Sequence, residues 1–185
     1  MSQSQRAVYP IEIAGIYREL PLFEVQAGLK IAILNILGDT ELVTACAKAL
    51  NEKLASRNYD VIVTAEAKSI PLAHALSQTS QKPYVVLRKQ YRSYMGKTIQ
   101  AETVSITTGR PQQLFLDEKD HELVWGEKVI LIDDVISTGS TLEGMSVIAR
   151  KANAEVTGMA AILTEGDQNQ WAEIVSLGHL PLFTD

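Results

Sequence analysis

Short, continuous apolar runs alternate along most of the chain with segments of helical spacing. Runs of this kind, rich in β-branched residues, occupy residues 60–66, 84–88, 129–132 and 154–163. Strands that read as apolar throughout are typical of a sheet covered on both faces. We therefore predict that these four segments are parallel strands at the centre of the fold.

Helical patterns lie between the predicted strands. In residues 42–54 the apolar side chains recur three and four positions apart, which indicates a helix with one buried stripe, and Asp39 or Thr40 is a plausible N-cap. Further helices are expected through residues 71–76 and from Leu142 to Lys151. Strands alternating with helices indicate βαβ units, so we expect an α/β fold with a mainly parallel central sheet and helices on both faces.

The N-terminal part of the chain is harder to interpret. Residues 8–15 alternate weakly and predict a short strand, whereas residues 16–37 are mostly apolar and are expected to be interrupted at Pro21 and Gly28. Residues 29–37 fit either a strand or the start of a helix, and the pattern does not decide between them.

A segment of different composition follows the strand at residues 84–88. Residues 89–98 carry three cations with two tyrosines between them and little apolar content. Residues 100–108 and 112–116 then flank Gly109-Arg-Pro, a pattern that predicts a β-hairpin. Residues 117–127 read as a polar connection and residues 177–183 as a short apolar tail.

Residues 129–141 hold the strongest chemical signal. Asp133 and Asp134 stand where the buried strand is expected to emerge, and five small residues, Ser137-Thr-Gly-Ser-Thr141, precede the next helix. Exposed N–H groups at a helix N-terminus bind phosphate, hydroxyls add donors, and glycine lets the backbone approach a ligand closely. A strand end followed by an ordinary N-cap is the alternative, but five small residues exceed what a cap needs. The loop is not a P-loop, because no Gly-Lys-Ser/Thr is present.

Two other predicted strands end in polar residues. Glu66-Ala-Lys-Ser69 follows one strand and Arg88-Lys89 ends the next. Since ligands of open α/β sheets bind outside the carboxyl ends of the strands, these residues should face the same crevice as Asp133. A guanidinium suits a diphosphate. The alternative for Lys68 is a solvated surface charge, and disorder alone would explain the composition of residues 89–98.

The stretch from residue 129 to 141 resembles the phosphoribosyl pyrophosphate loop of the type I phosphoribosyltransferases: four apolar residues, Asp133-Asp134, one apolar and one variable residue, then the five small residues. The resemblance spans about residues 35–165 and implies a purine phosphoribosyltransferase with Mg²⁺ as cofactor. Asp133 and Asp134 would be catalytic, facing the ribose hydroxyls and the water shell of the metal, with no direct protein ligand to it. The ribose 5-phosphate would contact Val135, Ile136, Ser137, Thr138, Gly139, Ser140 and Thr141, and pyrophosphate would contact Glu66, Ala67, Lys68, Ser69, Arg88, Lys89 and Arg92.

The resemblance also implies one domain over residues 1–185, with residues 1–35 and 165–185 as a small hood over the base, residues 89–108 as a flexible hairpin lid, and a homodimer. Two departures from the family pattern are visible. Ser69 replaces a usual glycine, and Met95-Gly-Lys-Thr98 lacks the glutamate that adenine-specific members carry in the lid.

The segment after the last core strand bears on the choice of base. Enzymes for 6-oxopurines tend to place a lysine there, whereas this chain has Glu165, and the nearest upstream lysine is Lys151. Because a 6-amino group needs an acceptor, we expect adenine, with xanthine as the alternative on account of the Glu66-Ala67 loop. A further alternative is that this segment never touches the base.

Composition narrows the remaining possibilities. A net charge of −5 argues against a nucleic-acid footprint, and no apolar run reaches the roughly 20 residues of a membrane span. The N-terminus lacks a signal-peptide layout, Cys46 has no partner for an internal disulfide, and the three histidines are scattered, so we expect a cytoplasmic protein without a His/Cys metal cluster. A non-catalytic sensor of phosphoribosyl pyrophosphate is the alternative function, although about 35 residues before the core leave little room for a winged-helix domain.

Overall fold

The computed structural model describes residues 6–104 and 111–184. In chain order the elements are β1 (Val8–Ile13), β2 (Ile16–Gln26), β3 (Leu29–Ala32), α1 (Thr40–Lys53), β4 (Val61–Ala65), α2 (Ile70–Ser80), β5 (Tyr84–Leu87), η1 (Ser93–Met95), β6 (Ile99–Val104), β7 (Pro111–Leu116), η2 (Glu118–Asp120), α3 (His121–Val124), β8 (Lys128–Ile136), α4 (Ser140–Lys151), β9 (Glu155–Glu165), η3 (Gln168–Trp171), β10 (Val175–Leu180) and β11 (Phe183–Thr184).

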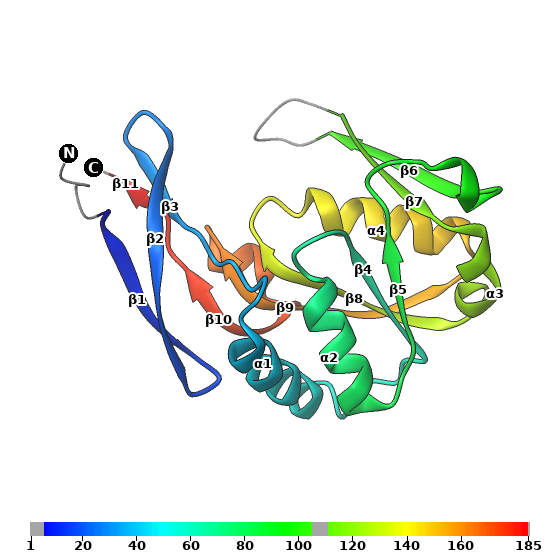
Figure 1. Ribbon diagram of the computed structural model, residues 1–185, viewed down its shortest axis with the longest axis horizontal. Helices are drawn as coiled ribbons and strands as arrows, with labels where there is room; N and C mark the ends of the chain where they lie inside the picture. Colours follow the sequence, from blue (N-terminus) through cyan, green and yellow to red (C-terminus); the bar gives the residue numbers. More distant parts are fainter. Residues whose placement is uncertain (1–5, 105–110, 185) are drawn as a thin grey trace.

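A five-stranded parallel sheet, the main sheet, forms the centre of the molecule in the order β10-β9-β8-β4-β5. Helices α1 and α2 cover one face, and α4 covers the other (Figure 1). The predicted α/β architecture is therefore confirmed, as are all four predicted core strands.

Each face of the main sheet has its own apolar core. Ile62, Ile130 and Ile132 pack with α1 and α2, whereas Val63, Leu131 and Leu142 belong to the cluster beneath α4. Because successive residues of β4 and β8 enter opposite cores, the stretches 61–63 and 129–132 must be apolar at every position, as their sequences are. The stripe of α1 is buried as predicted, and burial raises the pKa of the Cys46 thiol to about 12.

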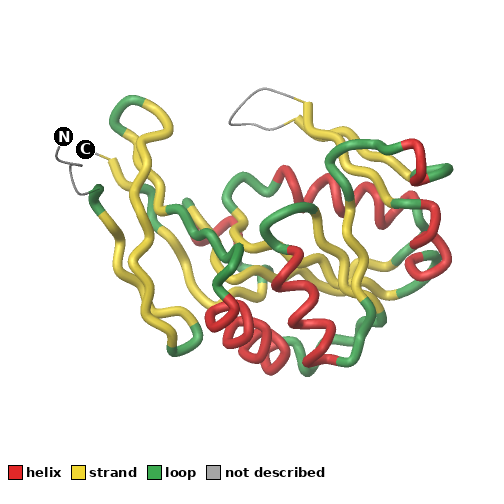
Figure 2. Tube along the Cα trace, viewed as in Figure 1, coloured by secondary structure: helices red, strands yellow, loops and turns green. Residues whose placement is uncertain are grey.

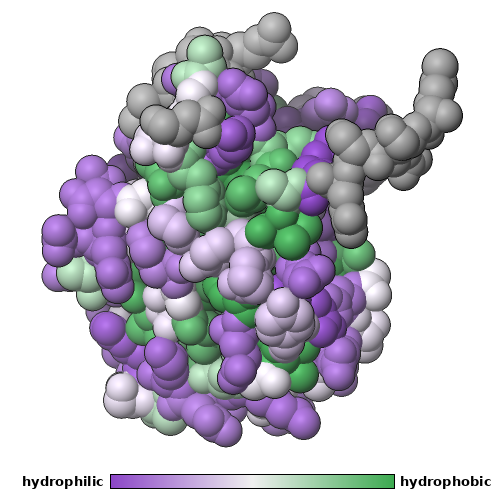
Figure 3. All heavy atoms as spheres, turned by 90° about the vertical axis from the view of Figure 1, so that its left-hand side faces the viewer, coloured by the Kyte–Doolittle hydropathy of each residue, from purple (hydrophilic) through white to green (hydrophobic). Residues whose placement is uncertain are grey.

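A second, antiparallel sheet, here called the hood sheet, joins β1, β2, β3 and β11 beside the main sheet (Figures 1 and 2). The expected interruption at Pro21 is wrong, because β2 runs through it. Pro21 pairs with Val8 at the end of the β1 ladder, where its missing N–H is tolerated, and its carbonyl accepts a bond from Ile33 N (3.0 Å). Gly28, at a φ of +74°, does make a turn, and the segment after it is a strand. The face of the molecule on this side mixes apolar and hydrophilic side chains (Figure 3).

The C-terminal segment is divided between the two sheets. The expected apolar tail is strand β10, which extends the main sheet in parallel beside β9, and only β11 joins the hood sheet, opposite β3. The described residues 165–184 therefore do not form one unit, and the chain crosses between the sheets at residues 181–182.

The predicted hairpin is present as β6 and β7, and these two strands are packed against α4. Ala101, Leu114 and Leu116 are buried against α4, and Lys151 Nζ donates to the carbonyl of Gln100 (2.7 Å). The residues between the strands, 105–110, lie outside the described residues. The expected polar connection at 117–127 contains η2 and α3, and no helix in the described ranges has the length and apolar character of a membrane span.

Candidate active site

The acid pair lies inside β8 rather than after it. The ladder with β4 stops at Thr64 and Ile132, whereas the ladder with β9 continues to Ile136 and Thr164. From Asp133 onward, β8 is thus paired with β9 only, and the two acids lie where β4 no longer pairs with it. The expectation that the strand ends before Asp133 is wrong, because β9 carries the strand further than the apolar run suggests.

The two carboxylates have different surroundings. Asp134 is 5% exposed, and its Oδ2 forms an ion pair with Lys68 Nζ at 2.8 Å. Asp133 is half-buried, and its Oδ1 accepts a bond from the backbone N–H of Asp134 (2.9 Å). Burial raises the pKa of the Asp133 carboxyl to about 7; the neighbouring Asp134 adds to this shift and Lys89 opposes it.

The small-residue loop encloses a cavity of about 180 Å³, lined by Asp133 and residues 135–142. Helix α4 begins at Ser140, two residues earlier than expected, so the hydroxyls of Ser140 and Thr141 stand in its first turn. Gly139 is the N-cap at a φ of +75°, and it has no side chain to occupy the N–H groups of that turn. The cavity therefore combines a helix N-terminus with hydroxyl donors, an arrangement that suits a phosphate.

Trp171, which the sequence analysis did not single out, touches this loop. A Cβ built on Gly139 would lie 3.1 Å from the ring of Trp171, and Trp171 Nε1 donates to the carbonyl of Glu165 (2.8 Å). The indole therefore links the loop to the end of β9.

The segment after β4 approaches the acid pair from the neighbouring strand. Glu66 and Ala67 are joined by a cis peptide bond, and Lys68 reaches both Asp134 and the carbonyl of Leu34 (3.3 Å). Lys68 therefore lies beside the acid pair, and its ammonium group is paired with the carboxylate of Asp134. Ser69 is 1% exposed, and its hydroxyl lies 2.8 Å from Thr64 Oγ1 and 2.9 Å from the carbonyl of Ala65, so its side chain faces the interior.

Arg88 and Lys89 are tied to Glu66. Arg88 Nε lies 2.5 Å from Glu66 Oε2, and the backbone N–H of Lys89 donates to Glu66 Oε1 (2.6 Å). Arg92 is exposed and its guanidinium contacts Gln90 (3.0 Å). The structure therefore brings Glu66, Arg88 and Lys89 together, while Arg92 has no described contact with them.

A second cavity of about 410 Å³ lies between the two sheets. It is lined by Val25, Gln26, Leu29, Ile31, Ser137, Thr138, Glu165, Gly166 and Leu182. Glu165 is 8% exposed, and burial raises the pKa of its carboxyl. The cavity is mainly apolar, with one buried carboxyl and the phosphate-type loop at its rim. Its residues from the hood sheet carry no sequence signal, because they form a wall only when β2 and β3 stand opposite β9.

Comparisons with known proteins agree with this geometry. A family model described as phosphoribosyl transferase domain matches residues 32–173. The purine biosynthesis transcriptional repressor PurR of Bacillus subtilis is 30% identical over 152 residues, which cover 81% of this chain and 53% of PurR. The hypoxanthine/guanine phosphoribosyltransferase of Methanotorris igneus is 31% identical over 133 residues, 72% of this chain and 69% of that protein.

The hypoxanthine/guanine phosphoribosyltransferase of Methanococcus voltae is 36% identical over 110 residues; like PurR, it is covered over only about half its length, at 55%. Among solved structures, the adenine phosphoribosyltransferase of Thermoanaerobacter pseudethanolicus has a TM-score of 0.68 at 18% identity, with 94% of this chain and 95% of that chain covered. It shows that the fold is shared over nearly the whole chain. With the family model spanning most of the sequence, the chain belongs to the phosphoribosyl transferase domain family, and its fold is that of the type I phosphoribosyltransferases.

Proposed function

We propose that the protein transfers the phosphoribosyl group of phosphoribosyl pyrophosphate to a purine base, giving a nucleoside monophosphate and pyrophosphate. The observation that carries this proposal is the acid pair of β8 immediately beside a phosphate-sized cavity at the N-terminus of α4. The base would occupy the cavity between the sheets, which adjoins the same loop through Ser137 and Thr138.

In the transfer, the bond between ribose C1 and the pyrophosphate oxygen breaks and its electrons leave with the diphosphate. A ring nitrogen of the purine forms the new bond to C1 and loses its proton. Positive charge develops on the sugar, and the carboxylates of Asp133 and Asp134 would stabilise it electrostatically. The 5-phosphate, held by the loop from Val135 to Thr141, would keep C1 in place.

The acid pair also fits Mg²⁺ in the outer sphere. Among the described residues, no cluster of three or more His, Cys, Asp or Glu side chains could hold a metal directly. Mg²⁺ tends to keep several waters and to bind through substrate phosphates, so Asp133 and Asp134 would contact those waters. The metal would supply charge neutralisation on the diphosphate, and its approach would favour ionisation of Asp133, whose pKa is raised without it.

The leaving diphosphate would lie beside the segment after β4. Lys68 is paired with Asp134, and Arg88 and Lys89 both contact Glu66 in this segment. Arg88 would have to share its guanidinium between Glu66 and the diphosphate, while Arg92 would need the segment 89–98 to close. We propose that this segment and the hairpin act as a lid that excludes water from the sugar cation.

We propose adenine as the base, with xanthine or another oxopurine as the alternative. Glu165 is a buried acceptor in the base cavity, and Lys68, whose charge acts on Glu165, is held by Asp134. An ionised carboxylate accepts a hydrogen bond from a 6-amino group and repels a 6-oxygen. The names of the curated relatives favour hypoxanthine and guanine, so the base must be decided by assay.

A regulator that binds phosphoribosyl pyrophosphate without turnover is the second candidate, because PurR is among the relatives at 30% identity. We also propose, from the family resemblance, that the protein acts as a homodimer in the cytoplasm without a nucleic-acid or membrane partner. Sedimentation equilibrium would test the dimer.

One experiment separates the two candidates. Purified protein with Mg²⁺ and phosphoribosyl pyrophosphate is assayed on adenine, hypoxanthine, guanine and xanthine under identical conditions. The transferase proposal predicts turnover, with adenine preferred, and its loss in Asp133→Asn/Asp134→Asn. Glu122→Gln, an exposed acid on α3, serves as the control. Tight binding of phosphoribosyl pyrophosphate without turnover of any base would favour the regulator.

A further inference from the structure

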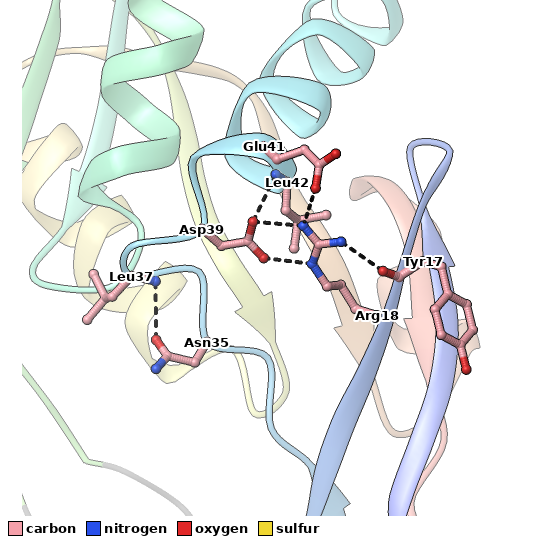
Figure 4. A network of polar contacts seen from close by, with 7 residues as sticks. All are labelled: Tyr17, Arg18, Asn35, Leu37, Asp39, Glu41 and Leu42. Atoms are coloured by element: carbon pink, nitrogen blue, oxygen red, sulfur yellow. Dashed lines mark hydrogen bonds and ion pairs between the residues drawn. The ribbon is translucent and has the colours of Figure 1, made fainter.

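Arg18 of the hood sheet forms an ion-pair network with the start of α1 (Figure 4). Its guanidinium forks onto the carboxylate of Asp39, with Nε 2.8 Å from Oδ2 and Nη2 2.9 Å from Oδ1. Nη2 also donates to Glu41 Oε2 (2.8 Å), and Nη1 donates to the carbonyl of Tyr17 (2.8 Å). A two-point contact of this kind fixes direction as well as distance.

The acceptor of this network is itself rigid. Asp39 is the N-cap of α1, and its Oδ1 accepts a bond from the backbone N–H of Leu42 (3.1 Å). Helix α1 packs its apolar stripe in the core below the main sheet. The Arg18 and Asp39 side chains are 28% and 23% exposed, whereas Glu41 is 69% exposed, so the Asp39 contact is the better shielded one.

Strand β2 connects this contact to the base cavity. It runs from Ile16 to Gln26 with a register shift against β3 between Glu24 and Gln26, and Val25 and Gln26 line the cavity. Val25 lies seven positions after Arg18, which corresponds to about 23 Å of strand. A tilt of about 5° at Arg18 would therefore move the cavity wall by about 2 Å, and misplacement by about 1 Å can reduce a rate by about 10²-fold.

The opposite wall of the cavity does not depend on Arg18. Ser137 and Thr138 belong to the loop between β8 and α4, and Glu165 ends β9, all on the main sheet. A tilt of the hood sheet would change the width of the base cavity and leave the phosphate cavity, formed by residues 133 and 135–142, unchanged.

We propose that Arg18 is a positioning residue for the purine: by holding Asp39, it sets the distance between the hood wall of the base cavity and the main sheet. The proposal rests on the proposed function in taking the cavity as the base site. It concerns the base alone, and it does not require that the protein turn over its substrates.

The test compares two ligands that differ only by the base. Calorimetry gives the affinities of adenosine monophosphate and of ribose 5-phosphate. The affinity of adenosine monophosphate divided by that of ribose 5-phosphate measures what the base contributes. Three changes of the network are informative: Arg18→Met keeps the aliphatic stem, Arg18→Lys keeps one ion pair, and Asp39→Asn keeps an N-cap of equal quality. Tyr17→Phe, an exposed neighbour on β2, is the control.

We expect Arg18→Met and Asp39→Asn each to lower the ratio at least tenfold, Arg18→Lys to lower it less, and ribose 5-phosphate affinity to stay within twofold. The double change should lower the ratio no further than either single change, because both remove one contact. Where wild-type turnover exists, KM for the base should rise while KM for phosphoribosyl pyrophosphate does not.

Two outcomes would overturn the proposal: an unchanged ratio in a folded Arg18→Met protein, or an equal loss of both affinities, which would indicate a general structural role. A wild-type ratio near one would show that the cavity takes no base and would overturn it as well. Absence of turnover together with the expected loss of ratio would refute the transferase while leaving Arg18 as a positioning residue.

Discussion

Replacing Gly139 by alanine places a defined strain in the phosphate loop. Gly139 has a φ of +75°, and an added Cβ would lie 3.1 Å and 3.4 Å from two carbons of the Trp171 ring. An L-residue in this left-handed conformation costs about 1–2 kcal/mol. The ring contact is tight by only a few tenths of an ångström, so we expect the backbone strain to dominate.

This strain can appear in either of two measurements. If the loop keeps its shape, the free energy of unfolding falls by about 1–2 kcal/mol, or about 2–8 °C in Tm for a chain of this size, and phosphate binding is unchanged. If the loop moves to relieve the strain, stability is kept and ribose 5-phosphate binds about 5- to 30-fold more weakly. The two losses should therefore sum to about 1–2 kcal/mol.

The assay measures thermal unfolding and ribose 5-phosphate affinity on the same protein. Gly126→Ala is the matched control, since Gly126 has the same φ of +75° with no atom within 4 Å of an added Cβ and lies in the turn before β8. The Gly126→Ala protein should lose stability and keep its affinity for ribose 5-phosphate. Adding Trp171→Ala to Gly139→Ala should recover only the part of the lost free energy that is due to the contact with the ring. A Gly139→Ala protein that matches the wild type in both measurements would refute the reasoning.

Three further predictions follow from the site. The folded-state pKa of Asp133 is raised above its ordinary value of 3.8 to about 7, so the free energy of unfolding should fall as pH rises from about 4 to about 7. Asp133→Asn should remove this dependence and be more stable than the wild type at pH 8. Urea titrations across pH, with Tm measured at pH 8, would check both. Glu165→Gln supplies a donor and should shift relative turnover from adenine towards hypoxanthine by about tenfold or more, whereas an unchanged preference would mean that Glu165 does not contact the base. Amide exchange in residues 89–104 should slow when phosphoribosyl pyrophosphate and a purine analogue bind together, and equal exchange with and without ligands would argue against a lid.

The centre of the fold was predictable because burial on both faces leaves an unambiguous pattern. The stretches 61–63 of β4 and 129–132 of β8 had to be apolar at every position, and α1 had to carry a stripe such as Leu42, Cys46 and Leu50. The acid pair was visible as two adjacent carboxylates directly after the apolar run, although its place inside β8 was not. These signals are local, so no knowledge of distant contacts was needed to read them.

Features that depend on a partner strand were not predictable in the same way. Pro21 looks like a break, yet it is tolerated where the β1 ladder ends, and β8 continues past Asp133 because β9 still pairs with it. Strand β10 looks like a tail until β9 is placed beside it. In each case the sequence of the segment permits two structures, and a contact more than ten residues away selects one.

The two cavities that we propose for the phosphate and the base differ in how they are formed, and this bears on specificity. The phosphate cavity is formed by one continuous segment, Asp133 with residues 135–142, whose geometry is set by the junction of β8 and α4. The base cavity is formed where Val25 and Ile31 of the hood sheet stand opposite Glu165. The hood wall of the base cavity and the lining of the phosphate cavity share no strand. Substitutions in the hood sheet can therefore alter the base that fits without disturbing the phosphate. On this basis, the proposed preference for one base should depend on the hood wall and Glu165 rather than on the phosphate loop.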